Sequence, residues 1–139
     1  MAAIVFFIKE YFIDHMKLSR KAFDRVVRKA VQRIPQEMRQ HLGNILISVQ
    51  KRPSRMILEE MDLPCDESLL GIFQGVPLRE RSLTSPPLFP DTIHLFQEPL
   101  EEICESIEEL EKQIELTVVH EIAHFFGISE ERLAELGYE

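Results

Sequence analysis

The sequence predicts one α+β domain, with a leading helix, a small mixed sheet and a helical C-terminal third that contains a pair of histidines. Its 139 residues suffice for a single domain with its own hydrophobic core. Apolar residues recur at helical spacing near both ends of the chain, and short alternating apolar runs bounded by glycine and proline lie between them. The hydrophobic fraction of 45% and the charged fraction of 29% are ordinary for a globular domain.

The leading helix is predicted to begin after Ser19 and to end at Pro35. Serine is a favoured N-cap residue, and proline cannot continue a helix. The apolar positions between these two residues repeat at helical spacing, which places them on one face. They are Phe23, Val26, Val27, Ala30, Val31 and Ile34.

Residues 1–15, MAAIVFFIKEYFIDH, stand apart from this domain. Their apolar run is too short to span a bilayer, and it lacks the basic region and the cleavage site of a secretory signal. Because an ordinary helix start follows Met16, we interpret residues 1–15 as an N-terminal extension and residues 16–139 as the domain. Our hypothesis is that the start codon was mis-called. Mass spectrometry of the native protein that finds Met1 or Ala2 at the N-terminus would contradict it.

The middle of the chain is predicted to supply three strands and one short helix. Residues 44–50 alternate apolar and polar side chains, which is typical of a strand. A short helix is expected over 54–61, followed by a strand that starts at Leu69 and turns at residues 74–77. Four prolines bracket the third strand, residues 92–97.

The C-terminal third is predicted to be helical from Pro99 onward, with a break near Glu109. Seven glutamates between residues 101 and 115 accompany a single basic residue, Lys112, which indicates a solvent-exposed face. Ser129 is the expected N-cap of a last short helix.

The charge and the cysteines exclude several classes of protein. A net charge of −8 and a pI near 5.2 disfavour binding to a nucleic-acid backbone, and the basic residues of 17–33 are interpreted as a solvated helix face. Cys65 and Cys104 form neither a CxxC pair nor a disulfide framework. Free thiols suit a reducing compartment. From the charge and the short apolar run at the N-terminus we expect no nucleic-acid partner and no membrane partner.

The stretch VVHEIAHFFGISEE, residues 118–131, contains the pattern His-Glu-x-x-His. On a helix, residues four apart lie on one face with Cβ atoms about 5–6 Å apart, so His120 and His124 can present their imidazoles to one zinc ion. Glu121 is rotated by about 100° from His120 and can hydrogen-bond a metal-bound water from the side. The pattern therefore predicts zinc-dependent hydrolysis with Glu121 as the catalytic base.

A catalytic zinc site has three protein ligands, so one more is needed beside the two histidines. Gly127 is expected to end the helix in a left-handed conformation, which lets the chain turn back towards the metal. Glu130 is then the candidate third ligand, with Glu131 and Glu135 as less favoured substitutes. The alternative is a structural helix that contains two histidines by chance.

These residues resemble a family of small bacterial metallopeptidases, the minimal zincins, whose pattern is HExxHxxGxxD near the C-terminus. The resemblance covers residues 16–138 and rests on the segments KAFDRVVRKAVQRIP, LLGIFQGVPLRERS, LFPDTIHLFQEPLE and HEIAHFFGI. It implies a zincin-like fold and a zinc cofactor held by His120 and His124. It also implies that Glu121 is the base and that the protein is cytoplasmic. Glu130 stands where the pattern has aspartate, which is one methylene shorter.

Other candidates have weaker signals. Tyr138 is a candidate donor to the oxyanion of a tetrahedral intermediate, although packing of the C-terminal end is the favoured interpretation. His94 is expected to be an ordinary strand histidine, while His15 and His41 indicate nothing specific. The strand at 92–97 is either a plain sheet member or an edge that adds an extended peptide.

Two functions stay open on this evidence. The first is hydrolysis of a peptide or protein substrate through a metal-bound water, with zinc as the cofactor. The second is a catalytically inactive module that keeps the fold and binds a protein partner through its cleft or its acidic face. The small size and the glutamate at position 130 favour the second somewhat. Zinc content distinguishes them, because the first function requires a bound metal.

Overall fold

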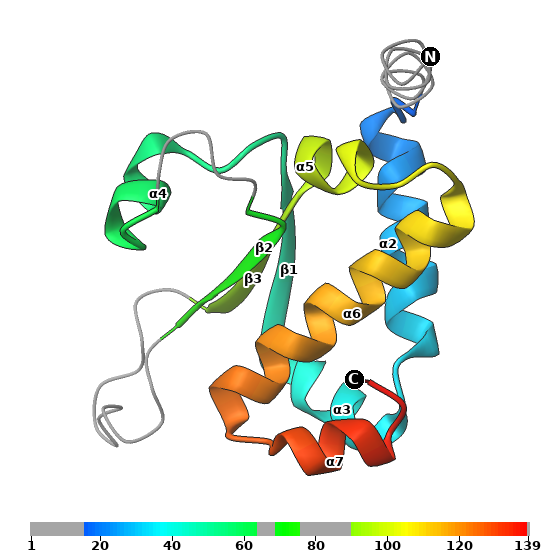
Figure 1. The fold of residues 1–139 in the computed structure, drawn as a ribbon, viewed down its shortest axis with the longest axis vertical. Helices are drawn as coiled ribbons and strands as arrows, with labels where there is room; N and C mark the ends of the chain where they lie inside the picture. The colour runs from blue at the N-terminus through cyan, green and yellow to red at the C-terminus, as the bar shows by residue number, and fades with distance from the viewer. Residues whose placement is uncertain (1–15, 64–68, 76–89, 139) are drawn as a thin grey trace, which may run out of the picture.

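The structure is a computed structural model that describes residues 16–63, 69–75 and 90–138. Its elements, in chain order, are helix α2 (Arg20–Arg33), helix α3 (Gln36–Arg39), the 3-10 helix η1 (Gln40–Asn44), strand β1 (Ile45–Gln50), helix α4 (Arg55–Glu60), strand β2 (Gly71–Gln74), strand β3 (Asp91–Phe96), helix α5 (Gln97–Glu102), helix α6 (Ile107–Phe126) and helix α7 (Glu130–Glu135). Figure 1 shows the sheet lying to one side of α2 and α6. The predicted α+β class, leading helix and mixed sheet are confirmed. The predicted extension, Cys65 and the end of the turn at 74–77 lie outside the described residues.

The three strands form a mixed sheet of order β1-β3-β2. Strand β1 runs parallel to the central strand β3, and β2 runs antiparallel to it. Ile47, Ile93 and Phe73 share one register row, and all three belong to the core or pack against it. Since β3 has a neighbour on both sides, it offers no edge to a peptide, and the sheet-member alternative for this strand is the correct one.

The leading helix α2 begins and ends as predicted. The Ser19 hydroxyl accepts a hydrogen bond from the Ala22 amide at 3.1 Å, and the helix ends before Pro35, with Ile34 in an extended conformation. A residue before proline is pushed out of the helical region, which explains this end. The predicted apolar face lies against the core, where Phe23 and Ala30 are completely buried.

The predicted break near Glu109 is wrong in position. The interruption lies between α5 and α6, and Ser106 is the N-cap of α6. The Ser106 hydroxyl accepts from the Glu109 amide at 3.1 Å, while Glu109 Oε2 accepts from the Glu105 amide at 2.9 Å. The Ser106 hydroxyl thus satisfies an amide that the helix itself leaves unpaired, and the Glu109 carboxylate binds the amide of the residue before the cap. The sequence signal for it is the pattern Ser-x-x-Glu at residues 106–109.

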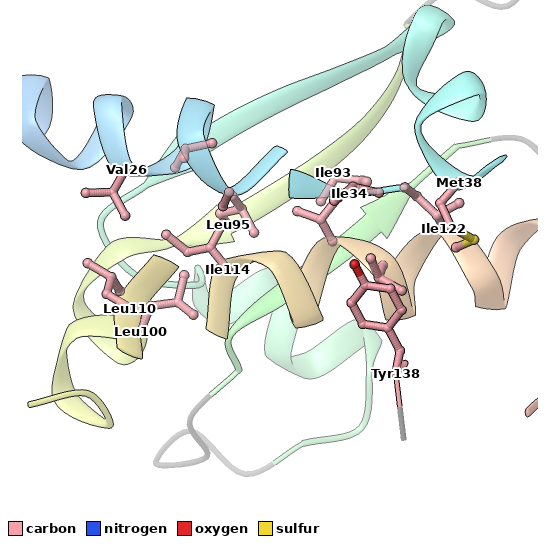
Figure 2. Packing of buried hydrophobic residues seen from close by; sticks show 14 of the residues in the cluster. Val26, Ile34, Met38, Ile93, Leu95, Leu100, Leu110, Ile114, Ile122 and Tyr138 are labelled. Carbon is pink, nitrogen blue, oxygen red and sulfur yellow. The ribbon is translucent and has the colours of Figure 1, made fainter. Parts of the chain in front are cut away.

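The core lies between the sheet and the two long helices. Figure 2 shows Val26 of α2, Ile93 and Leu95 of β3 and Ile114 of α6 converging on one interior. Tyr138 joins this cluster from the end of the chain and is only 4% exposed. The C-terminal segment is therefore packed onto the domain. Within the ranges that the structure describes, no helix is both long and apolar enough to cross a bilayer.

Candidate metal centre

The His-Glu-x-x-His pattern lies in the last turns of α6, the longest helix described. His120 and His124 are four residues apart, so they share one face of the helix, and both are exposed to solvent. The neighbouring residues Ile122 and Ala123 point into the core. The burial pattern of α6 therefore turns the two imidazoles outward, where an ion from solvent can reach them.

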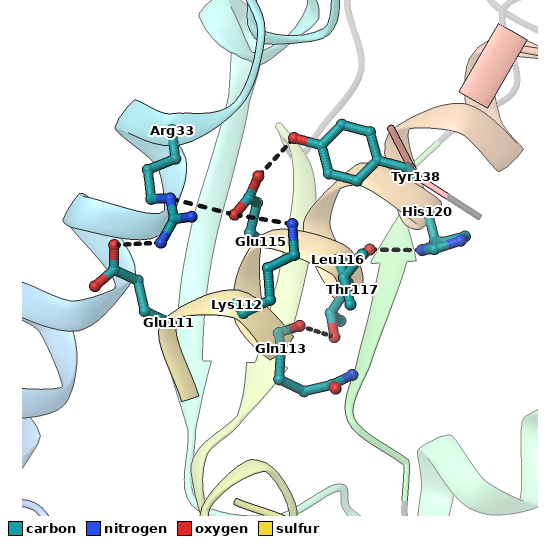
Figure 3. A network of polar contacts seen from close by, with 9 residues as sticks. All are labelled: Arg33, Glu111, Lys112, Gln113, Glu115, Leu116, Thr117, His120 and Tyr138. Atoms are coloured by element: carbon teal, nitrogen blue, oxygen red, sulfur yellow. Dashed lines mark hydrogen bonds and ion pairs between the residues drawn. The ribbon is translucent and has the colours of Figure 1, made fainter. Parts of the chain in front are cut away.

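A hydrogen bond to the backbone determines which ring nitrogen of His120 bears the proton. His120 Nδ1 lies 2.7 Å from the carbonyl oxygen of Leu116, one turn earlier (Figure 3). A carbonyl oxygen only accepts, so Nδ1 must donate in this bond. In the neutral ring Nε2 then bears the lone pair, which is the form that binds a metal. Histidine ligands commonly donate the other ring N–H in this way.

Glu121 faces the sheet rather than open solvent. Its Oε2 accepts a hydrogen bond from the Phe73 amide of β2 at 3.1 Å. Burial raises the pKa of Glu121, while the Phe73 amide and the charges of His124 and His120 act to lower it. A partly buried carboxylate with a raised pKa is a better proton acceptor than an ordinary surface glutamate.

Strand β2 lies close to α6 because it contains Gly71. A Cβ atom at this position would lie 2.8 Å from Thr117 Cγ2 and 3.0 Å from the His94 carbonyl oxygen. Further along the strand, the Phe73 ring stacks on Phe125, with centroids 4.1 Å apart. The glycine and the ring stack hold β2 against the end of α6, beside Glu121.

Replacement of Gly71 by alanine is expected to lower the free energy of unfolding by about 1–3 kcal/mol, because the new methyl group overpacks the contact between β2 and α6. Urea denaturation measures this. Gly43→Ala is the matched control, since a Cβ there meets nothing within 4 Å. Equal stability of the two variants would contradict this close approach.

Gly127 ends α6 in the predicted left-handed conformation, with φ of 69°. The amides of Gly127 and Ile128 both donate to the Ala123 carbonyl, the second at 2.9 Å, so the chain turns sharply. Ser129 then caps α7 by accepting from the Arg132 amide at 3.1 Å. The predicted sequence of turn, cap and last helix is confirmed.

Gly127→Ala is expected to cost about 1–2 kcal/mol of stability, since a side chain is strained in the left-handed region. A Cβ there would meet nothing within 4 Å, so backbone strain is the whole effect. Gly127→Asn should lose less, because asparagine tolerates this conformation. Thermal denaturation of the two variants provides the comparison, and an alanine variant as stable as the wild type would show that the strain is absent.

Glu130, the predicted third ligand, is the first residue of α7 and is exposed. In the part of the chain that the structure describes, no three His, Cys, Asp or Glu side chains gather closely enough to hold a metal. The structure thus places His120, Glu121 and His124 on one helix, but it does not bring Glu130 into a three-donor cluster with the histidines. Ligation by Glu130 stays a prediction. Of its substitutes, Glu135 pairs with Arg132 at 2.6 Å.

Tyr138 takes up the packing position that the sequence favours. Its hydroxyl donates to Glu115 Oε1 at 2.6 Å, and both side chains are buried. Burial and the Glu115 carboxylate raise the pKa of Tyr138. Its hydroxyl proton is directed at Glu115, and its role at an oxyanion stays a prediction.

Of the other histidines, His15 lies outside the described residues, and His41 stacks on Phe126 at the end of α6, with ring centroids 4.2 Å apart. His94 lies apart from the pair. His94 alternates with the core residues Ile93 and Leu95, so it faces the opposite side of the sheet from α6. Gln50 and Gln74 bond its two ring nitrogens at 3.1 and 2.9 Å, and burial lowers the pKa of His94. It is the satisfied strand histidine that the sequence predicts.

The mixed sheet, the long helix bearing His-Glu-x-x-His and the glycine turn behind it are features of the zincin class of metallopeptidase. A family model described as zincin-like metallopeptidase matches residues 42–138, and the chain belongs to this family. The match begins after α2, so the opening helix, which the sequence resemblance included, lies outside it. A search of the curated proteins gave no match.

Proposed function

We propose that this chain is a zinc-dependent metallopeptidase that hydrolyses peptide bonds in a peptide or protein substrate. His120 and His124 would hold the zinc ion, with Glu130 as the third ligand, and Glu121 is the catalytic base. Zinc supplies a Lewis acid that polarises a substrate carbonyl and makes a water molecule more acidic. Membership of the zincin-like metallopeptidase family and the placement of the pattern on one helix support the proposal.

The main supporting observation is the hydrogen bond between His120 Nδ1 and the Leu116 carbonyl oxygen. It orients the ring and leaves Nε2, on the solvent side, with the lone pair. Imidazole nitrogens are among the donors that zinc prefers, and helical spacing brings a second one, that of His124, to the same face. These two side chains fit zinc by donor type and by placement.

Glu121 performs the proton transfers. The Phe73 amide binds Oε2, which limits rotation of the carboxylate and leaves Oε1 to take the proton of the attacking water. Burial raises the pKa of Glu121, which makes the carboxylate a stronger base towards the attacking water. The same carboxyl group then donates this proton to the leaving amine, so one residue acts first as base and then as acid.

The substrate approaches along β2. Within the described residues this strand pairs with β3 alone, and the Phe73 amide on its other edge is already bonded to Glu121, so an extended peptide can add only to the rest of that edge. Because Glu121 is bonded to Phe73 of the same strand, a peptide bound there has its backbone beside the base. We therefore expect an extended segment of a cytoplasmic peptide or protein as the substrate.

Hydrolysis of a mixed library of quenched fluorescent peptides tests the proposal. Zinc-loaded protein should cleave members of the library, a chelator should abolish cleavage, and added zinc should restore it. Cleavage that persists after complete removal of the metal would contradict a zinc mechanism. Zinc-loaded protein that cleaves no peptide would instead favour the inactive protein-binding module.

A further inference from the structure

A pair of stacked aromatic rings lies beside the proposed base. Phe125 follows Glu121 by four residues on α6, so the two side chains lie on one face of the helix, one turn apart. The Phe125 ring stacks on the Phe73 ring of β2, with centroids 4.1 Å apart, and the Phe73 amide donates to Glu121 Oε2 at 3.1 Å. The base is thus joined to the two rings through the helix and through the strand.

Phe125 differs from its aromatic neighbours in what it packs against. Phe73 and Phe126 are partly buried against the hydrophobic core, and the Phe126 ring also stacks on His41. Phe125 is partly buried too, but among the described residues it neither belongs to the core nor packs against it. Its ring stacks on Phe73 and meets the Phe126 ring edge-on, with centroids 5.0 Å apart. A large apolar side chain is therefore left partly open to solvent next to the base.

Such a surface favours some substrate side chains over others. Removal of apolar area from water favours binding, and aromatic rings attract further rings in stacked or edge-on arrangements. A charged substrate side chain would lose water against the rings without gaining a partner. The surface beside Glu121 is therefore suited to aromatic and large aliphatic side chains.

We propose that Phe125, backed by the Phe73 ring, is a specificity-determining residue that selects substrates with an aromatic or large aliphatic side chain next to the cleaved bond. This inference rests on the proposed function, because it takes Glu121 as the base. Since Glu121 must reach the water that attacks the cleaved bond, the substrate residues that flank this bond are the ones close to Phe125. The substrate class is thus narrowed from any extended peptide to one with a large apolar residue at this place.

Binding of uncleavable peptides to the full chain tests the inference without turnover. In each peptide the central amide bond is reduced to a methylene amine, which cannot be hydrolysed. One peptide has phenylalanine before this bond, a second has phenylalanine after it, and a third has alanine on both sides. We expect the wild type to bind one of the phenylalanine peptides about tenfold more tightly than the alanine peptide, as burial of a large apolar side chain should give. Titration followed by NMR chemical shifts measures the affinities.

Phe125→Ala should remove this preference, so that the three peptides bind the variant with similar affinity. Phe125→Leu keeps an apolar side chain at the same position and should retain most of the preference. Ile107→Ala is the matched control, because Ile107 is 51% exposed at the opposite end of the same helix, and its loss should leave the preference as in the wild type. Circular dichroism checks that all three variants are folded.

A purely structural role of Phe125, in which it only holds β2 on α6, gives a different result. Phe125→Ala would then weaken binding of all three peptides by the same factor and leave the preference unchanged, which would overturn the inference. Equal affinity of the wild type for the three peptides would overturn it as well.

Cleavage sites in the peptide library, mapped by mass spectrometry, separate this inference from the proposed function. Cleavage without enrichment of large apolar residues beside the cleaved bond would overturn the inference and leave the proposed function intact. A library that zinc-loaded protein leaves uncleaved would overturn the proposed function and the inference that rests on it, even where the binding preference persists.

Discussion

Replacement of Glu121 by glutamine is expected to lower the rate of peptide hydrolysis by about 10²–10⁴-fold, which is the usual contribution of a general base. The zinc content should not change, since Glu121 is not among the proposed ligands. Glutamine is close in size, and its amide oxygen can still accept from the Phe73 amide, so β2 and α6 should stay together. Steady-state kinetics and metal analysis of the same sample provide the two readouts.

Glu108→Gln serves as the control for this experiment. Glu108 is an exposed residue in the first turn of α6, and the same change of charge there should leave hydrolysis at the wild-type rate. Full activity in Glu121→Gln would exclude Glu121 as the base. Loss of zinc together with activity would show instead that Glu121 helps to hold the metal.

Replacement of His124 by alanine is expected to reduce zinc affinity by more than the roughly 10–100-fold that loss of an outer-shell partner costs, because a ligand itself is removed. His124 is exposed at the end of α6, so the fold should survive the change. Zinc affinity measured by chelator competition, with circular dichroism as the check on folding, tests the prediction.

His94→Asn is the matched control, since His94 lies on the other face of the sheet and is bonded to Gln50 and Gln74. It removes one imidazole from the protein without touching the proposed site. If both histidine variants bind zinc as tightly as the wild type, the ion is held elsewhere in the chain.

Much of the fold could be predicted, because the residues that end helices and the spacing of apolar residues agree with how the elements pack in the structure. Single residues mark the ends of helices by their own local chemistry, and the structure confirms three of them: the hydroxyl of Ser19, the ring of Pro35 and the absent side chain of Gly127. The apolar face of α2 follows from spacing alone. The sequence places the break before α6 too late, because an acidic run conceals the cap at Ser106, which is visible only as the pattern Ser-x-x-Glu.

The contacts that define the site could not be predicted to the same degree. Helical spacing places His120 beside His124, but it does not determine which ring nitrogen of His120 bears the proton; the carbonyl of Leu116 does. The bond from Phe73 to Glu121 joins residues 48 positions apart in the chain, so it depends on sheet order and on the close approach at Gly71. The Tyr138–Glu115 pair likewise depends on how the last segment returns to α6.

The most direct test of the central claim is the zinc content of the chain, measured by atomic emission spectroscopy on protein purified without chelator. We predict about one zinc ion per chain, as expected for a catalytic site with His120 and His124 among three protein ligands. His120→Ala, purified in the same way, should lose this ion. Protein that contains no zinc and takes up none when the metal is supplied would contradict the account.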